Sequence, residues 1–399
     1  MGNFFLVPLA LGSYSSPLSP LPSDASLPAL RRFFGREQET ASLCRFLTNK
    51  ESGGCRLMTL TGTGGVGKTR LSQEVARQLL EHFGGGVWFV SLAELTSAET
   101  LLNHIAQTLQ ITPEVGLPLE DQIVGELSQA STLLVLDNFE RLVEDGKEIV
   151  SRLLEMAPDL FLLITSQRKL DIPEERELPL APLPLQAYEG DFDEIRQQVC
   201  VRLFVDRVQE ARPDFQINAT NAPVISQLCS TLEGIPLAIE LAAAWSQLLT
   251  PAQMLERMEK EYTWLVNSRK GGNQRHRTLQ TAIAWSYNLL DANLQDLFCQ
   301  LSVFVRGCTL DAVQEILAPT LGSADPMYLE AALRSLCQRS LLFVHEEGEG
   351  IRFWMLEAVR QFAQERLEEQ TNRKAVLVQR HAEYYLRFSQ TESERLNKV

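Results

Sequence analysis

The chain has 399 residues, a length that corresponds to about two to three domains. Its 45% hydrophobic and 22% charged residues are ordinary for a globular protein, and a formal net charge of −14 argues against a nucleic-acid surface as its main role. The seven cysteines form no Cys-x-x-Cys pair and the five histidines are scattered, so we expect reduced thiols and no zinc site. The reduced thiols indicate a cytoplasmic protein, and since no stretch has the length of a transmembrane helix, we expect no membrane partner.

The first half of the chain alternates short apolar runs with amphipathic stretches. Residues 1–27, rich in Ser and Pro, are expected to form a flexible leader. After them, strands that alternate with helices predict a parallel, doubly wound α/β sheet in a domain over 28–185. The expected strands cover 57–61, 87–92, 132–137, 160–165 and 176–180, and the expected helices cover 37–48, 68–82, 97–109, 119–129 and 145–156.

A phosphate-binding sequence follows the first of these strands. Residues 62–69 read Gly-Thr-Gly-Gly-Val-Gly-Lys-Thr and fill the pattern G-x-x-x-x-G-K-T between a strand and a helix. The glycines let successive backbone N–H groups face phosphate oxygens, and the helix that begins near Lys68 points its positive end to the same place. We expect Lys68 to contact the β- and γ-phosphates and Thr69 to bind Mg²⁺. A chance glycine-rich turn is the alternative, and the complete pattern argues against it.

The third expected strand ends in an acidic residue. Its long apolar run suits a strand that is buried on both faces, so Asp137 lies at the carboxyl edge of the sheet, where ligands bind in open α/β folds. In phosphate-loop NTPases an acidic residue at this place holds Mg²⁺, and Glu140 is placed to orient or deprotonate an attacking water. The alternatives are a helix N-cap for Asp137 and a solvated surface carboxylate for Glu140.

Strands become rare after the Pro-rich stretch over 180–185, which marks a domain boundary. We expect a helical domain over 186–266 and, after a second boundary at 267–276, a domain over 267–356 with the outline of a winged helix, which is helices followed by a hairpin. The helices of the last segment, 357–399, could open a helical repeat array. Helices are expected over 195–211, 221–232, 236–248, 251–260, 278–290, 293–302, 309–317, 327–337, 357–369 and 373–392, and strands over 341–345 and 351–355.

The order of these landmarks resembles the STAND class of signal-transduction ATPases, most closely its NB-ARC-like branch, which includes plant NLR receptors and many bacterial regulators. Phe34-Gly35-Arg36-Glu37 is similar to the h-G-R-E motif that borders adenine in this class. Gly234-Ile235-Pro236-Leu237 is similar to its G-x-P motif, whose proline packs on adenine. Residues 277–304 look like its winged helix, and the likeness extends over residues 28–392. Each motif is weak alone, and their common order makes the resemblance specific.

The motifs and the resemblance together give a candidate site with ATP or ADP and Mg²⁺ as cofactors. The catalytic candidates are Lys68, Asp137, Glu140 and Arg168, and the metal-binding candidates are Thr69 and Asp137. The nucleotide-binding candidates are Phe34, Gly35, Arg36, Gly62, Thr63, Gly64, Gly65, Val66, Gly67, Lys68, Thr69, Arg70, Pro236 and Leu237.

Two positions depart from the family pattern. The family usually places an arginine that senses the γ-phosphate directly after the Thr-Ser of the fourth strand, whereas here Gln167 follows and Arg168 comes one place later. Because a shift of one residue at a strand end turns a side chain to the other face, it stays open whether Arg168 replaces the sensor. Leu356 stands where many relatives have the His that contacts the β-phosphate of ADP, and Arg352 is one candidate to compensate.

The resemblance implies a nucleotide-operated switch. We expect a monomer closed on ADP that exchanges ADP for ATP, opens near 267–276, forms a homo-oligomer and resets by slow ATP hydrolysis. The activating signal and the effector and sensor partners are not specified by the sequence. The alternatives are a continuously cycling NTPase, a transcription regulator whose DNA-binding module lies outside these residues, and a scaffold that binds nucleotide without hydrolysing it. Residues 277–357 have no run of Lys and Arg, only dispersed arginines, which argues against DNA contact by the winged helix.

Overall fold

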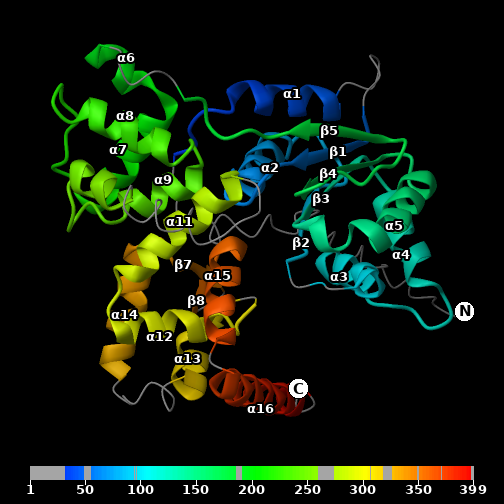
Figure 1. Cartoon of the computed structure of the whole chain (residues 1–399). Coiled ribbons are helices and arrows are strands. Elements are labelled where there is room, and N and C mark those ends of the chain that lie inside the picture. The colour runs from blue at the N-terminus through cyan, green and yellow to red at the C-terminus, as the bar shows by residue number, and fades with distance from the viewer. Residues whose placement is uncertain are drawn as a thin grey trace, which may run out of the picture.

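A computed structural model describes most of the chain (Figure 1). The expected leader over 1–27 and most of the expected boundary at 267–276 lie outside the described residues. The described residues are 32–48, 55–93, 95, 97–185, 191–258, 274–305, 307–317, 326–347, 350–369 and 371–396.

The N-terminal part is a five-stranded parallel sheet, which confirms the predicted α/β fold class. The strand order is β2-β3-β4-β1-β5, so β4 lies between the strand that leads to the phosphate loop and the strand that ends in Asp137. Parallel pairing brings the carboxyl ends of all five strands to one edge of the sheet. The strands are β1 (Leu57–Thr61), β2 (Val87–Ser91), β3 (Thr132–Asp137), β4 (Leu160–Ser166) and β5 (Glu175–Pro179).

Helices cover both faces of this sheet, and each face has a hydrophobic cluster of its own. Leu133 and Val135 of β3 face a cluster with α1 and α2, whereas Leu134 and Leu136 face a cluster with α3, α4 and α5. Burial on both faces explains why the strand is apolar at nearly every position. The elements are α1 (Glu37–Thr48), α2 (Lys68–Gln78), α3 (Leu101–Thr108), α4 (Leu119–Leu127), α5 (Val143–Met156) and the 3₁₀ turns η1 (Ala98–Thr100) and η2 (Phe139–Arg141).

A helical part follows the sheet, as predicted. The helix expected over 195–211 is divided in two, because Gln198 has an extended backbone with φ −57° and ψ 132°. The helix expected over 236–248 is also shorter, and it ends at Ala243. The helices are α6 (Phe192–Gln197), α7 (Val199–Ala211), α8 (Ala222–Thr231), α9 (Pro236–Ala243) and one over 251–258.

The C-terminal part has the helices and the hairpin of the predicted winged helix. A third strand, β6 (Cys308–Thr309), extends the hairpin to an antiparallel sheet of order β6-β8-β7, and it is too short to give a pattern in the sequence. The other elements are α11 (Gln274–Asn288), α12 (Ala292–Leu301), α13 (Leu310–Leu317), α14 (Pro326–Gln338), β7 (Phe343–Glu347), β8 (Gly350–Trp354), α15 (Glu357–Glu368) and α16 (Thr371–Leu396).

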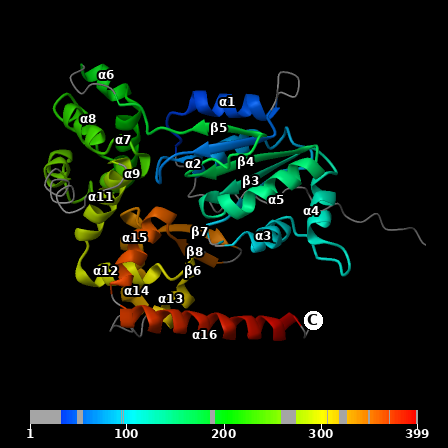
Figure 2. The same cartoon turned by 45° about the vertical axis from the view of Figure 1, so that its right-hand side comes forward.

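The helical and winged-helix parts share one continuous hydrophobic core, which is separate from the two clusters of the sheet. At their junction the indole N–H of Trp245 donates to Ser286 Oγ at 2.9 Å, and its ring meets Trp285 edge to face. Figure 2 shows α16 lying along the side of the winged-helix part that faces away from α6 to α8. Among the described helices, none combines the length and the apolar composition needed to cross a membrane.

Candidate functional site

The loop between β1 and α2 has a conformation that requires its glycines. Gly65 and Gly67 have φ angles of 73° and 99°, in the left-handed region that favours glycine. A Cβ atom at Gly62 would lie 2.7 Å from the carbonyl oxygen of Leu180. Gly67 is the N-cap residue of α2, so the loop ends at the positive end of that helix.

Lys68 is a buried cation held inside this loop. Its side chain is 8% exposed, and its Nζ donates to the carbonyl oxygens of Gly62 at 2.7 Å and Thr63 at 3.1 Å. Burial lowers the pKa of Lys68, and the nearby carboxylates of Glu140 and Asp137 oppose that shift. The loop therefore presents a poorly hydrated positive charge whose carbonyl partners can be exchanged for stronger, anionic acceptors.

Asp137 contacts the other metal-binding candidate. Its Oδ1 accepts hydrogen bonds from Thr69 Oγ1 at 2.8 Å and from Thr165 Oγ1 at 2.6 Å. Burial raises the pKa of Asp137 to about 6, and the two hydroxyl donors act against that rise. Asp137 is not a helix N-cap, because Asn138, in a left-handed conformation, has that place before η2.

This pair suits Mg²⁺ rather than a metal held by protein ligands alone. Among the described residues no three His, Cys, Asp or Glu side chains lie together as a metal site would need. Mg²⁺ is usually bound through one or two carboxylates, waters and the phosphates of a nucleotide. The Thr69 hydroxyl and the Asp137 carboxylate fit that donor set.

The two remaining catalytic candidates are placed differently. Glu140 lies in η2 with one carboxylate oxygen, Oε2, buried and without a hydrogen-bond partner, and its Oε1 is 3.5 Å from Gln167 Nε2. Arg168 is 54% exposed and forms an ion pair with Glu144 of α5 at 2.7 Å. The structure therefore does not bring Arg168 to the phosphate loop.

Residues from three later helices cover the loop. The backbone N–H of Leu237 in α9 donates to the carbonyl oxygen of Gly65 at 3.2 Å. A Cβ atom at Gly65 would lie 2.9 Å from Leu279 Cδ2 of α11, and one at Gly64 would lie 3.9 Å from Ala358 Cβ of α15. Pro236 stands in the first turn of α9 and thereby positions Leu237. The sequence indicated Pro236 and Leu237 but gave no local signal for Leu279 or Ala358.

The segment before α1 lies beside the same loop. Arg36 is 8% exposed, and its Nη2 donates to the carbonyl oxygens of Ala181 at 2.5 Å and Val66 at 3.5 Å. Both Gly35 and Arg36 have positive φ angles, 66° and 72°. A left-handed arginine is costly and persists only where its surroundings fix it, as is common at functional sites. The candidate residues Arg36, Val66 and Leu237 are thus brought together around the loop.

Comparisons with known proteins agree with this geometry. Residues 32–164 match the model of an AAA ATPase domain, and residues 290–368 match that of a winged helix-turn-helix domain. An uncharacterized protein of Mycobacterium tuberculosis is 31% identical over 348 residues, which cover 87% of this chain and 84% of that protein. A second M. tuberculosis protein, named as an HTH-type transcriptional regulator, is 32% identical over 330 residues, or 83% of this chain but only 36% of that protein.

A solved structure has the same fold. The crystal structure of a STAND protein with a tetratricopeptide repeat sensor from Pyrococcus horikoshii superposes with a TM-score of 0.53 at 15% identity. The superposition covers 90% of this chain and 46% of that one, so the chain spans about half the length of its structural neighbour.

The chain therefore has an AAA-type ATPase domain followed by a winged helix, in the fold of the solved STAND protein. The chain belongs to the same family as the M. tuberculosis protein to which it is 31% identical. The narrower NB-ARC assignment, the predicted domain limits and the roles of the site residues stay predictions.

Proposed function

We propose that the chain is an ATP- and ADP-binding molecular switch in which the sheet domain binds the phosphates and the later domains close over them. One observation supports this most: Gly65 of the phosphate loop is contacted by both Leu237 of α9 and Leu279 of α11. Because these helices belong to a core that is separate from the sheet, a change at the phosphates alters the contact between two bodies of the molecule. Such a contact can favour one domain arrangement with each nucleotide.

Each residue of the site would have a separate role in binding the nucleotide. Lys68 would exchange its carbonyl partners for phosphate oxygens, and the first N–H groups of α2 would donate to the same anion. Thr69 and Asp137 would hold Mg²⁺, which neutralises phosphate charge. Glu140, with its unpartnered buried oxygen, would orient the attacking water.

We propose that hydrolysis is slow and serves to reset the switch. A cation that stabilises the transition-state charge raises the rate of phosphoryl transfer by orders of magnitude. The arginine nearest to the usual sensor position, Arg168, is exposed and paired with Glu144 instead. Fast steady-state turnover by the purified chain would contradict this and support the continuously cycling NTPase.

The test of the switch is the mass of the molecule with each nucleotide. We expect light scattering after gel filtration to give a monomer with ADP and a homo-oligomer with Mg²⁺ and a non-hydrolysable ATP analogue. The same mass under both conditions, with binding of both nucleotides shown by titration, would contradict the proposed link between nucleotide and assembly.

A second candidate function is DNA binding, which the winged helix-turn-helix match over 290–368 favours. The net charge of −14 argues against it. Fluorescence anisotropy with a mixed-sequence DNA duplex, at about 50 and 200 mM salt, distinguishes a DNA-binding regulator from a switch that does not bind DNA. Binding that weakens steeply with salt would support a DNA-binding regulator. The switch alone predicts no binding at either concentration.

A further inference from the structure

The short segment over 32–36 joins two bodies of the molecule. The Phe33 ring packs against the sheet-domain cluster that contains α1 and α2, and the guanidinium carbon of Arg70 lies 5.8 Å from its centroid. The next residue, Phe34, packs against the separate core of the helical and winged-helix parts. A Cβ atom at Gly35 would lie 2.9 Å from Val199 Cγ1 at the start of α7. We call residues 32–36 the strap.

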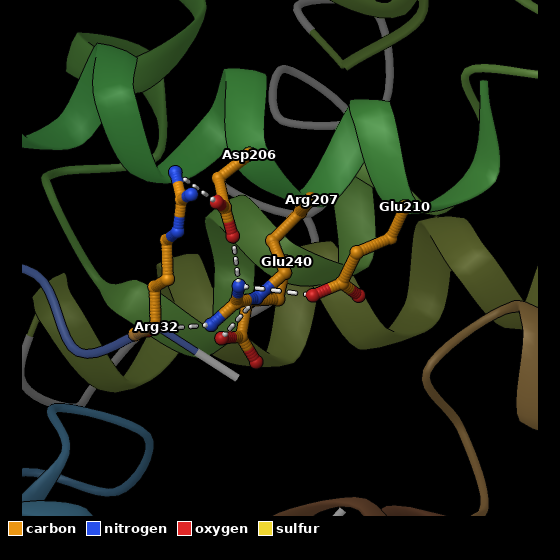
Figure 3. A network of polar contacts seen from close by, with 5 residues as sticks. All are labelled: Arg32, Asp206, Arg207, Glu210 and Glu240. Carbon is orange, nitrogen blue, oxygen red and sulfur yellow. Dashed lines mark hydrogen bonds and ion pairs between the residues drawn. The ribbon is translucent and has the colours of Figure 1, made fainter. Parts of the chain in front are cut away.

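One buried arginine of the helical domain holds the strap (Figure 3). Arg207 of α7 is 7% exposed, and its Nη2 donates to the backbone carbonyl oxygen of Arg32 at 3.2 Å. Its Nε donates to Glu240 of α9 at 3.1 Å, and its Nη1 donates to Asp206 at 2.5 Å and to Glu210 at 3.1 Å. All three nitrogens are therefore used, and only Nη2 reaches the strap.

Further contacts reinforce the same attachment. The Arg32 side chain forms an ion pair with Asp206 at 3.6 Å. The guanidinium carbons of Arg207 and Arg202 lie 6.0 Å and 5.6 Å from the centroid of the Phe34 ring, within the range of cation–π attraction. The planar fork of an arginine can serve these partners together, and the point charge of a lysine cannot.

The strap ends at the phosphate loop. Two residues after Phe34, the Arg36 guanidinium donates to the carbonyl oxygen of Val66 in that loop and to Ala181 in the connection to the helical domain. We propose that Arg207 is a positioning residue for nucleotide binding: it fastens the strap to the helical domain and thereby keeps Arg36 against the loop. This inference rests on the proposed function, since it takes the loop as the nucleotide site.

The proposal requires variants that separate the planar guanidinium fork of Arg207 from its positive charge. Arg207→Ala removes both, and Arg207→Lys keeps the charge without the fork. Arg212→Ala is the matched control, because Arg212 caps the same helix and lies over Phe215, and its partners Asp214 and Ser246 are in the helical domain. Phe34→Leu keeps an apolar side chain in the strap but removes the ring that faces the two arginines, and it serves if Arg207→Ala does not fold.

The first readout is hydrogen exchange in the intact chain. With Arg207→Ala and Arg207→Lys we expect the amides of residues 33–36 to exchange at least tenfold faster, with those of β1 and β3 unchanged. Faster exchange throughout the chain would show that Arg207 only stabilises the fold, and unchanged exchange of the strap would show that it does not hold the strap. Either result would overturn the proposal.

The second readout is nucleotide affinity, with a fluorescent ADP analogue as the probe. We expect about tenfold weaker binding by Arg207→Ala and Arg207→Lys, about threefold weaker binding by Phe34→Leu, and parental affinity in Arg212→Ala. In the two Arg207 variants the single-turnover rate at saturating ATP should stay within about twofold of the parent, because no reacting group has changed. Parental affinity in Arg207→Lys would overturn the role of the fork. A parent protein that binds no ADP would instead overturn the proposed function.

Discussion

At the scale of single residues, the site is a buried cation enclosed with acidic groups. Lys68, Asp137 and Glu140 interact electrostatically, and burial shifts the pKa of Lys68 down and that of Asp137 up. Both shifts show charged groups that have lost water without gaining a full set of partners. A phosphate at Lys68 and a cation at Asp137 would supply the missing charges.

Loss of the Lys68 charge should abolish nucleotide binding. For Lys68→Ala we expect the affinity for ADP to fall by at least about 100-fold, which corresponds to about 3 kcal/mol. Titration with a fluorescent ADP analogue measures this. Lys147→Ala, which removes a partly exposed lysine of α5, is the control and should bind as the parent does. Tight binding by Lys68→Ala would refute the assignment of the loop.

The raised pKa of Asp137 predicts a pH-dependent stability. The folded state binds the proton of Asp137 more tightly than the unfolded state does. Protonated Asp137 therefore stabilises the fold at low pH, and this contribution is lost as the pH rises through about 6. Asp137→Asn should therefore gain stability relative to the parent between pH 5 and pH 7, by roughly 1 kcal/mol. Urea unfolding with a chelator and without nucleotide measures this. An equal stability difference at both pH values would contradict the shifted pKa.

Sequence patterns located the part of the site that is local in the chain. The phosphate loop and the strand before Asp137 have strong patterns, and in the structure Thr69 donates a hydrogen bond to Asp137. The bond from Thr165 to Asp137 and the attachment of Arg32 to Arg207 depend on which strands and helices become neighbours. A pattern along one chain does not indicate which elements become neighbours, so the sequence did not predict these two hydrogen bonds.

At the scale of elements, three helices meet the phosphate loop from outside the sheet domain. The N-terminal end of α9 donates a backbone hydrogen bond to the loop, α11 contributes Leu279, and α15 contributes Ala358. Leu279 is 2% exposed, so it is enclosed by this contact rather than lying on the surface. These helices would have to leave the loop if the molecule opens.

Shortening the side chain at the centre of this contact should speed the release of nucleotide. For Leu279→Ala we expect ADP to dissociate about tenfold faster, because deletion of a buried leucine side chain costs about 2–5 kcal/mol and part of that cost falls on the closed state. Stopped-flow displacement of a fluorescent ADP analogue measures the rate. Gln280→Ala, at the next position of α11, should release ADP as the parent does. Equal rates in Leu279→Ala and the parent would show that α11 does not close the site.

The elements themselves were largely predictable, and the exceptions have physical reasons. Apolar runs and helical periodicity predicted the five parallel strands and most helices. The break at Gln198 follows no Gly or Pro signal, since only the local backbone angles separate α6 from α7. The strand Cys308–Thr309 is formed by pairing with β8 and has no pattern of its own.

At the scale of the whole molecule, the chain forms a sheet domain and a second body that combines the helical and winged-helix parts. The second body has one core, in which Trp245, just after α9, meets Trp285 of α11. The expected opening near 267–276 lies mostly outside the described residues, so its position stays a prediction. The described contacts between the two bodies are centred on the phosphate loop and the strap, which is where nucleotide would influence them.

The most direct test of the nucleotide switch is to purify the chain without added nucleotide, denature it and identify what is released by chromatography. We predict close to one ADP per chain, because a loop covered by α9, α11 and α15 should retain the nucleotide that closes it. That result would also show that Leu356, where many relatives have the His that contacts ADP, does not prevent the chain from retaining ADP. A chain that releases no nucleotide and then hydrolyses added ATP rapidly would contradict the switch and support a continuously cycling NTPase.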